Sequence, residues 1–156
     1  MLSNEAQELS ELLIAKGLTI SVAESCTGGS LSHAITSIPG ASSYFDCGYI
    51  TYSNQSKTEM LGVDIKTIKT FGAVSEEVAL EMVIGLATKS HSDVAISITG
   101  VAGPTGGTPE KPVGMVCFGF FYDGKTSTTT QLFSGDRASI VSQSVSYALK
   151  QLSLRF

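Results

Sequence analysis

The chain alternates between short apolar segments typical of strands and longer segments whose apolar residues repeat at helical spacing. Strands are predicted at 18–23, 44–52, 93–99, 113–122 and 125–133, and helices at 6–16, 30–37 and 54–61. Two further helices are predicted to begin after Ser75 and after Asp136, with their apolar positions within 78–87 and 140–152. Strands that alternate with helices predict an α/β fold with helices on both faces of the sheet. Because Asp123-Gly124 is a strong hairpin signal, the last two strands should pair antiparallel in a mixed sheet.

The ends of several predicted helices carry recognisable signals. Asn54, Ser75 and Asp136 are expected to act as N-caps, because their side chains can accept hydrogen bonds from the first free amides of a helix. Gly17 is expected to end the first helix, since glycine readily adopts the left-handed conformation found there. These signals fix the order of the predicted elements along the chain.

Length and charge limit the kinds of protein that the chain can be. Its 156 residues suit a single domain over 1–156, and 42% hydrophobic against 15% charged residues suggests a homo-oligomer, a dimer or larger, that covers apolar surface. A net charge of −4 without basic runs argues against a nucleic-acid partner. No apolar stretch of about 18 residues predicts a membrane span. The N-terminal segment is acidic and lacks the basic region of a signal peptide, and the three cysteines are typical of reduced thiols. Both features favour a cytoplasmic protein, and no membrane partner is expected.

Three loops with chemically useful residues each follow a predicted strand directly. They are 24–29, 53–57 and 100–112. In sheets of this kind, ligands bind outside the carboxyl ends of the strands. Hydroxyls and amides at 25–29 suit an anion or a developing oxyanion, although a well-capped turn would look the same. Four glycines within 99–108 allow close backbone contact with a ligand, although a flexible surface loop is the alternative.

A serine, a tyrosine and a lysine together form a chemically sufficient set for acyl transfer. Ser42 needs a base to act as a nucleophile, and Lys57 can serve if burial lowers its pKa. Tyr52 could relay a proton or hold the lysine in place. Taken alone, such a set occurs by chance, and a surface lysine on a short helix is the simpler interpretation. His33, His91 and Cys26 offer weaker nucleophile schemes, and no cluster has the spacing of a metal site.

Three segments together resemble a known family. They are 23–29 (AESCTGG), 51–57 (TYSNQSK) and 99–108 (TGVAGPTGGT), and 72–75 (GAVS) and 111–114 (KPVG) extend the match. The chain resembles the CinA C-terminal domain family, whose stand-alone members are nicotinamide-nucleotide amidohydrolases. The resemblance implies a three-layer α/β/α sandwich with a mixed, mostly parallel sheet. It also implies hydrolysis of nicotinamide mononucleotide to nicotinate mononucleotide and ammonia in pyridine-nucleotide salvage, with no cofactor and no metal.

The resemblance assigns roles to individual residues. It implies that Ser42 is the nucleophile, with Ser43 beside it, that Lys57 is the general base and that Tyr52 supports it. Arg137 is expected to meet the substrate phosphate. The full set of predicted residues that bind the small nucleotide substrate is Ser25, Thr27, Gly28, Thr99, Gly100, Gly103 and Arg137. Two alternatives stay open: a nucleotide-binding or regulatory module without catalysis, and an amidase for another small nucleotide.

Overall fold

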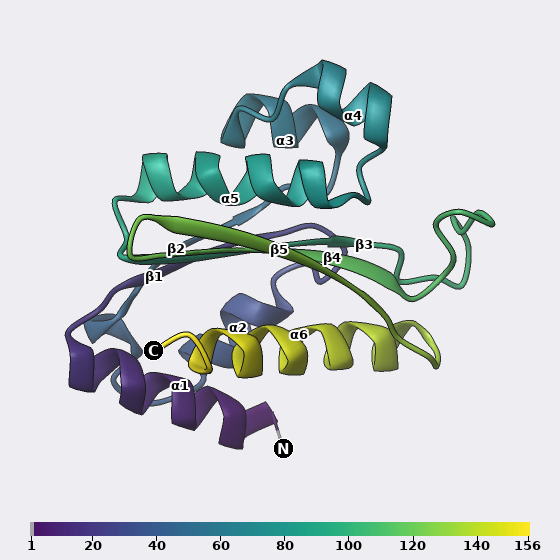
Figure 1. Cartoon of the computed structure of the whole chain (residues 1–156). Coiled ribbons are helices and arrows are strands. Elements are labelled where there is room, and N and C mark those ends of the chain that lie inside the picture. Colours follow the sequence, from purple (N-terminus) through teal and green to yellow (C-terminus); the bar gives the residue numbers. More distant parts are fainter. Residues whose placement is uncertain (1) are drawn as a thin grey trace.

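A five-stranded mixed sheet forms the middle layer of the protein (Figure 1). The computed structural model describes residues 2–156. The strands lie in the order β2-β1-β3-β4-β5. β1 pairs parallel with both β2 and β3, whereas β4 pairs antiparallel with β3 and β5, so four strands point one way and β4 points the other. Their bounds are β1 Ile20–Glu24, β2 Phe45–Ile50, β3 Val94–Gly100, β4 Met115–Tyr122 and β5 Lys125–Leu132.

Helices cover both faces of this sheet, which confirms the predicted three-layer α/β/α architecture (Figure 1). One outer layer consists of α1 (Leu2–Lys16), α2 (Ser30–Thr36) and α6 (Arg137–Ser153). On the other face, α5 (Glu76–Ser90) packs on the sheet, and α3 (Asn54–Leu61) with α4 (Ile65–Phe71) packs outside it. A single turn of 3₁₀ helix, η1 (Ala41–Ser43), leads into β2.

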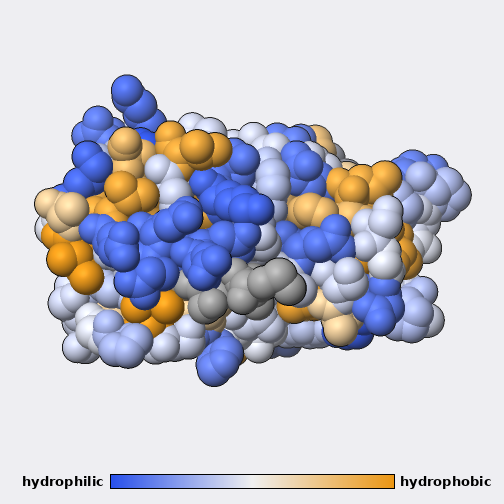
Figure 2. Space-filling model, turned by 90° about the horizontal axis from the view of Figure 1, so that it is seen from below, coloured by the Kyte–Doolittle hydropathy of each residue, from blue (hydrophilic) through white to orange (hydrophobic). Residues whose placement is uncertain are grey.

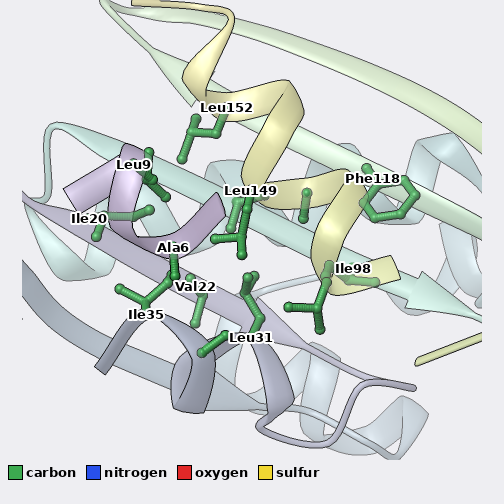
Figure 3. Packing of buried hydrophobic residues seen from close by; sticks show 14 of the residues in the cluster. Ala6, Leu9, Ile20, Val22, Leu31, Ile35, Ile98, Phe118, Leu149 and Leu152 are labelled. Atoms are coloured by element: carbon green, nitrogen blue, oxygen red, sulfur yellow. The ribbon is translucent and has the colours of Figure 1, made fainter. Parts of the chain in front are cut away.

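Each face of the sheet has its own apolar core. The larger core lies between the sheet and α1, α2 and α6, and Figure 3 shows its side chains pointing toward one another from all three helices and the strands. Its members include Leu9, Leu31, Leu149 and Phe118, all at most 1% exposed. The smaller core, beneath α5, is built around Val78, Met82 and Leu86. Each such side chain contributes roughly 1.5–3 kcal/mol to folding when it leaves water.

The outer surface of the α1, α2 and α6 layer is mixed in character. Figure 2 shows polar residues over much of this face, with apolar residues in several separate groups between them. This is the distribution expected for helices whose apolar stripes face the sheet. Within residues 2–156, no helix is both long enough and apolar enough to cross a membrane.

The sequence predicted most element boundaries closely, with two differences. Ser53, not Asn54, caps α3, since its hydroxyl accepts a hydrogen bond from the Ser56 amide at 3.1 Å. The short helix α4 was not predicted, because two lysines and two threonines interrupt its apolar repeat over seven residues. Its N-cap, Asp64, accepts from the Lys66 amide at 2.8 Å. The predicted caps Ser75 and Asp136 are confirmed, each accepting from an amide three residues on.

Glu76 ties the start of α5 to the edge strand β5 and supports a testable prediction. Its carboxylate accepts hydrogen bonds from the hydroxyls of Thr128 and Thr130, both at 2.7 Å. These bonds lower the pKa of Glu76, because they stabilise its ionised form. We expect Glu76→Gln to lower the free energy of unfolding by about 1 kcal/mol at neutral pH.

The effect of Glu76→Gln should depend on pH in a defined direction. The pKa of Glu76 is depressed in the folded state, so the stabilisation is complete above the ordinary value of 4.5 and is lost as pH falls through the folded-state pKa. Urea unfolding at neutral pH and in buffers below that pKa measures both limits. Glu77→Gln, one residue along the same helix turn, is the matched control. A pH-independent difference between the two variants would contradict the assignment.

Candidate functional site

Lys57 lies buried inside the protein, and its ammonium group faces three oxygen atoms. The side chain is 1% exposed. Its Nζ is 3.0 Å from Ser25 Oγ, 2.8 Å from the Thr51 carbonyl and 3.4 Å from the Tyr52 carbonyl. The lysine reaches these atoms because α3 begins just beyond β2, at the edge of the sheet where β1 also ends. Burial lowers the pKa of Lys57, since water no longer stabilises its charge.

Ser25 occupies the turn between β1 and α2. It is 7% exposed, and its amide donates to the Ile98 carbonyl of β3 at 3.0 Å, which fixes the turn against the neighbouring strand. The chain then reverses at Gly28 and Gly29, whose φ angles of 57° and 103° lie in the left-handed region. The result is a serine hydroxyl presented at the carboxyl end of a strand and at the start of a helix.

The buried carboxylate of Glu24 holds this turn in place through hydrogen bonds to the turn and to the first residues of α2. It accepts hydrogen bonds from the Thr27 hydroxyl at 2.7 Å, the Leu31 amide at 2.8 Å, and the Ser32 amide and hydroxyl at 2.9 and 2.8 Å. The Thr27 hydroxyl is therefore engaged inside the protein. Of the predicted substrate-binding residues, neither Thr27 nor Gly28 lines the cleft described next, and Gly28 borders a separate hollow beside His33.

Ser25 and Lys57 lie at the base of an open cleft of about 290 Å³. The three loops that follow strands in the sequence all contribute to it, as expected for the carboxyl ends of adjacent strands. Among the residues that the structure describes, its lining holds the permanently charged guanidinium of Arg137, the basic side chain of Lys57 and no carboxylate. The cleft therefore favours an anionic ligand. Its lining comprises Ser25, Cys26, Tyr52, Asn54, Lys57, Ala73, Val74, Thr99, Gly100, Val101, Ala102, Gly103, Thr105, Gly106 and Arg137.

Arg137 joins two parts of the cleft from the first position of α6. One guanidinium nitrogen donates to the Gly103 carbonyl and the other to the Tyr52 hydroxyl, both at 2.7 Å. The phenol of Tyr52 thus contacts Arg137, while the backbone carbonyl of Tyr52 contacts Lys57. Of the predicted substrate-binding residues, Thr99, Gly100 and Gly103 line the cleft, and the Thr99 hydroxyl donates to the Ala73 carbonyl at 2.8 Å.

The structure does not bring the predicted nucleophile Ser42 to Lys57. Ser42 lies exposed on η1, at the amino end of β2. Since β2 runs parallel to β1, with Phe45 opposite Ile20, Ser42 is at the far edge of the sheet from Ser25. The five residues of β1 alone separate the two edges by about 15 Å. The neighbouring Ser43 donates to the Gly40 carbonyl on that same far side.

Ser25 is the serine that contacts Lys57, a pairing that the sequence analysis did not predict. It was predicted only to bind substrate, yet its hydroxyl is the one that meets Lys57. Two signals pointed to it. A serine between a strand and a helix with nearby glycines is a common setting for an exposed nucleophile. In addition, the segments 24–29 and 53–57 each follow a predicted strand directly, and loops at the carboxyl ends of parallel strands lie at one edge of a sheet.

The other candidate nucleophiles, Cys26, His33 and His91, do not come together in the cleft. Cys26 lines the cleft beside Ser25, but burial raises the pKa of its thiol to about 12, so it stays protonated. His33 lies outside the cleft, and His91 ends α5 with a φ of 59°. Within residues 2–156, no group of three His, Cys, Asp or Glu side chains is placed to hold a metal ion.

Comparison with known proteins decides the family. The model of the CinA C-terminal domain matches residues 2–156. The chain belongs to the CinA C-terminal domain family. Two relatives resemble it along nearly their whole length, and both are named nicotinamide-nucleotide amidohydrolase PncC. The protein from Enterobacter agglomerans is 49% identical over 92% of this chain and 88% of its own length. The protein from Escherichia coli is 45% identical, covering 100% of this chain and 98% of its own.

Solved structures of CinA superfamily proteins share this fold closely. The competence damage-inducible protein A of Klebsiella pneumoniae superposes with a TM-score of 0.95 at 36% identity, covering 98% of this chain and 95% of that one. Other family members are longer. A CinA-like protein from Kosmotoga olearia is 50% identical over 88% of this chain, which spans only 34% of that protein. The matching region therefore makes up nearly all of some relatives and about a third of others.

Proposed function

We propose that this chain hydrolyses the carboxamide of nicotinamide mononucleotide, releasing nicotinate mononucleotide and ammonia. The observation that carries the proposal is the contact between buried Lys57 and Ser25 Oγ, 3.0 Å apart at the base of a cleft that also presents Arg137. The names of the two full-length PncC relatives supply the substrate class. A serine paired with a desolvated lysine is a sufficient nucleophile and base for cleaving an amide.

Ser25 takes the place of Ser42 as the proposed nucleophile, with Lys57 as its general base. A neutral amine has two hydrogens and one lone pair. In this site the two hydrogens have acceptors in the carbonyls of Thr51 and Tyr52, which leaves the lone pair for the Ser25 hydroxyl proton. Desolvation favours this neutral form, since it lowers the pKa of Lys57. The two carbonyls therefore orient the base as well as hold it.

The proposed reaction proceeds through an acyl-enzyme. Lys57 removes the proton from Ser25 as Oγ attacks the carboxamide carbon, and a tetrahedral intermediate forms. The backbone amide of Cys26, which lines the cleft beside Ser25, is suited to stabilise its oxyanion. Protonated Lys57 then delivers the proton to the leaving nitrogen, and ammonia departs. A water molecule, deprotonated by the same lysine, attacks the ester and releases nicotinate mononucleotide while Ser25 regains its proton.

Arg137 is the proposed partner of the substrate phosphate. Its guanidinium is planar and permanently charged, and such groups bind phosphate through paired hydrogen bonds. It sits at the amino end of α6, where the helix dipole also favours negative charge. The hydrogen bond from Arg137 to the Tyr52 hydroxyl supports a role for Tyr52 in orienting this guanidinium. The phosphate would therefore bind near the rim formed by Tyr52 and Gly103.

The proposed function is tested by measuring ammonia released from nicotinamide mononucleotide by the purified protein, with a chelator present. Nicotinamide and nicotinamide riboside, which keep the carboxamide but lack the phosphate, are the matched substrates. We expect release from the mononucleotide and a much higher KM for the two compounds without phosphate. A folded protein that is thermally stabilised by the mononucleotide but releases no ammonia would instead be a binding module. Faster release from another nucleotide amide would reassign the substrate.

A further inference from the structure

Four consecutive carbonyls, at the last residue of α4 and in the connection that follows it, all accept hydrogen bonds from side chains. The Phe71 and Val74 carbonyls both accept from Lys111 Nζ. The Gly72 carbonyl accepts from the Ser75 hydroxyl at 2.8 Å, and the Ala73 carbonyl accepts from the Thr99 hydroxyl at 2.8 Å. Segment 71–74 thus owes its position to groups outside its own backbone. Two of its residues, Ala73 and Val74, line the cleft.

Lys111 is the member of this set that belongs to the glycine-rich loop. Its ammonium group lies at the carboxyl end of α4, where carbonyls at the negative end of the helix dipole attract a cation. The chain turns away from α4 at Gly72, whose φ of +82° lies in the left-handed region that favours glycine. The segments 72–75 and 111–114, which the family resemblance singles out without a role, therefore meet at this contact.

The same contact connects two walls of the cleft. The loop that carries Lys111 also contributes Gly103 and Gly106 to the lining, and Arg137 holds that loop at the Gly103 carbonyl. Lys111 thus joins the glycine-rich loop to segment 71–74, as Arg137 joins it to Tyr52. Without the ammonium, the Phe71 and Val74 carbonyls would lose their donor, and the two walls would keep the bond from the Thr99 hydroxyl to the Ala73 carbonyl but lose the one through Lys111.

We propose that Lys111 is a positioning residue for substrate binding, which fixes the Ala73–Val74 wall relative to the glycine-rich loop. This inference rests on the proposed amidohydrolase function of the same cleft. Lys111 touches neither Ser25 nor Lys57 in the hydrogen bonds of this structure, so its loss should leave the chemical step intact and should loosen the walls that contact the bound nucleotide.

The test compares Lys111→Met with Lys111→Arg and with Lys89→Met, which removes an exposed lysine from the far end of α5. For Lys111→Met we expect KM for nicotinamide mononucleotide to rise about tenfold, with kcat changed less than about threefold and its pH profile unchanged. Lys111→Arg, which keeps cationic donors, should recover part of the affinity. Amide hydrogen exchange should become faster in 71–75 in Lys111→Met alone.

The outcomes separate this inference from the proposed function. A wild-type protein that binds the nucleotide without releasing ammonia would end the amidohydrolase proposal, and the Kd of the nucleotide would then replace KM in the comparison. A Lys111→Met protein with lower thermal stability but unchanged KM or Kd would show a purely structural role and overturn the inference. Unchanged exchange in 71–75 would overturn it as well, because the segment would then not depend on Lys111.

Discussion

Replacing Ser25 by alanine is expected to lower kcat for ammonia release from nicotinamide mononucleotide by at least about 10³-fold. The Ser25 hydroxyl is the proposed nucleophile. Within residues 2–156, no other hydroxyl group is hydrogen-bonded to Lys57 Nζ. The substitution removes one oxygen atom, and the Ser25 amide keeps its bond to the Ile98 carbonyl. Thermal stability and nucleotide binding should therefore stay close to those of the wild type.

The matched control for this prediction is Ser42→Ala, the substitution that the sequence alone would have selected. Ser42 is exposed and lies at the opposite edge of the sheet, so this variant should keep kcat within about twofold of the wild type. Single-turnover measurements distinguish loss of chemistry from slow product release. If Ser42→Ala lost activity and Ser25→Ala kept it, the active site proposed in the cleft would be in the wrong place.

Replacing Lys57 by methionine is expected to lower kcat by about 10²- to 10⁴-fold, the usual contribution of a general base. Methionine has a similar length and suits a buried site, so the fold should survive the change. Lys57→Arg is the informative partner variant, because arginine keeps the positive charge but does not lose its proton in the working range. Both variants should be inactive if the neutral amine is required, whereas an active Lys57→Arg protein would mean that the charge alone matters.

The pH dependence of kcat/KM for the wild-type protein should follow the titration of Lys57. Burial lowers the pKa of Lys57 from its ordinary value of 10.5, so the neutral form becomes available at lower pH than for an exposed lysine. We expect kcat/KM to rise about tenfold per pH unit on the acid side and to level off at the pKa of Lys57. Activity that falls as pH rises through this range would contradict a neutral lysine base. The comparison is made over the pH range in which thermal unfolding shows the protein to be folded.

Much of the fold could be predicted from local sequence patterns. The strand that ends at Gly100 is a short apolar run followed by a glycine-rich loop, and Asp123-Gly124 alone indicated the β4–β5 hairpin. Ser75 and Asp136 indicated where α5 and α6 begin, because an N-cap contact involves residues only three or four positions apart. Helix α4 escaped prediction since its amphipathic pattern is too short to stand out, and its stability comes from packing against α5.

The site was predictable in outline but not in its central contact. The three loops at 24–29, 53–57 and 100–112 were expected at one edge of the sheet, and all three contribute to the cleft. Lys57 and Arg137 were both selected from the sequence, and both line it. Thr27 was also selected, but Glu24 binds its hydroxyl inside the turn. Sequence patterns cannot show such a contact, because it depends on which buried acceptor lies nearest.

The sequence by itself determined the order and type of the main elements and the residue types available for chemistry, because these depend on periodicity, caps and turns within a few residues. Only the tertiary structure decided which serine Lys57 meets. Ser25 and Lys57 are 32 residues apart, and the parallel pairing of β1 with β2 brings them to one edge while it carries Ser42 to the other. The burial that lowers the pKa of Lys57 is likewise a property of the packed chain, since it arises from segments distant in sequence that exclude water from one amine.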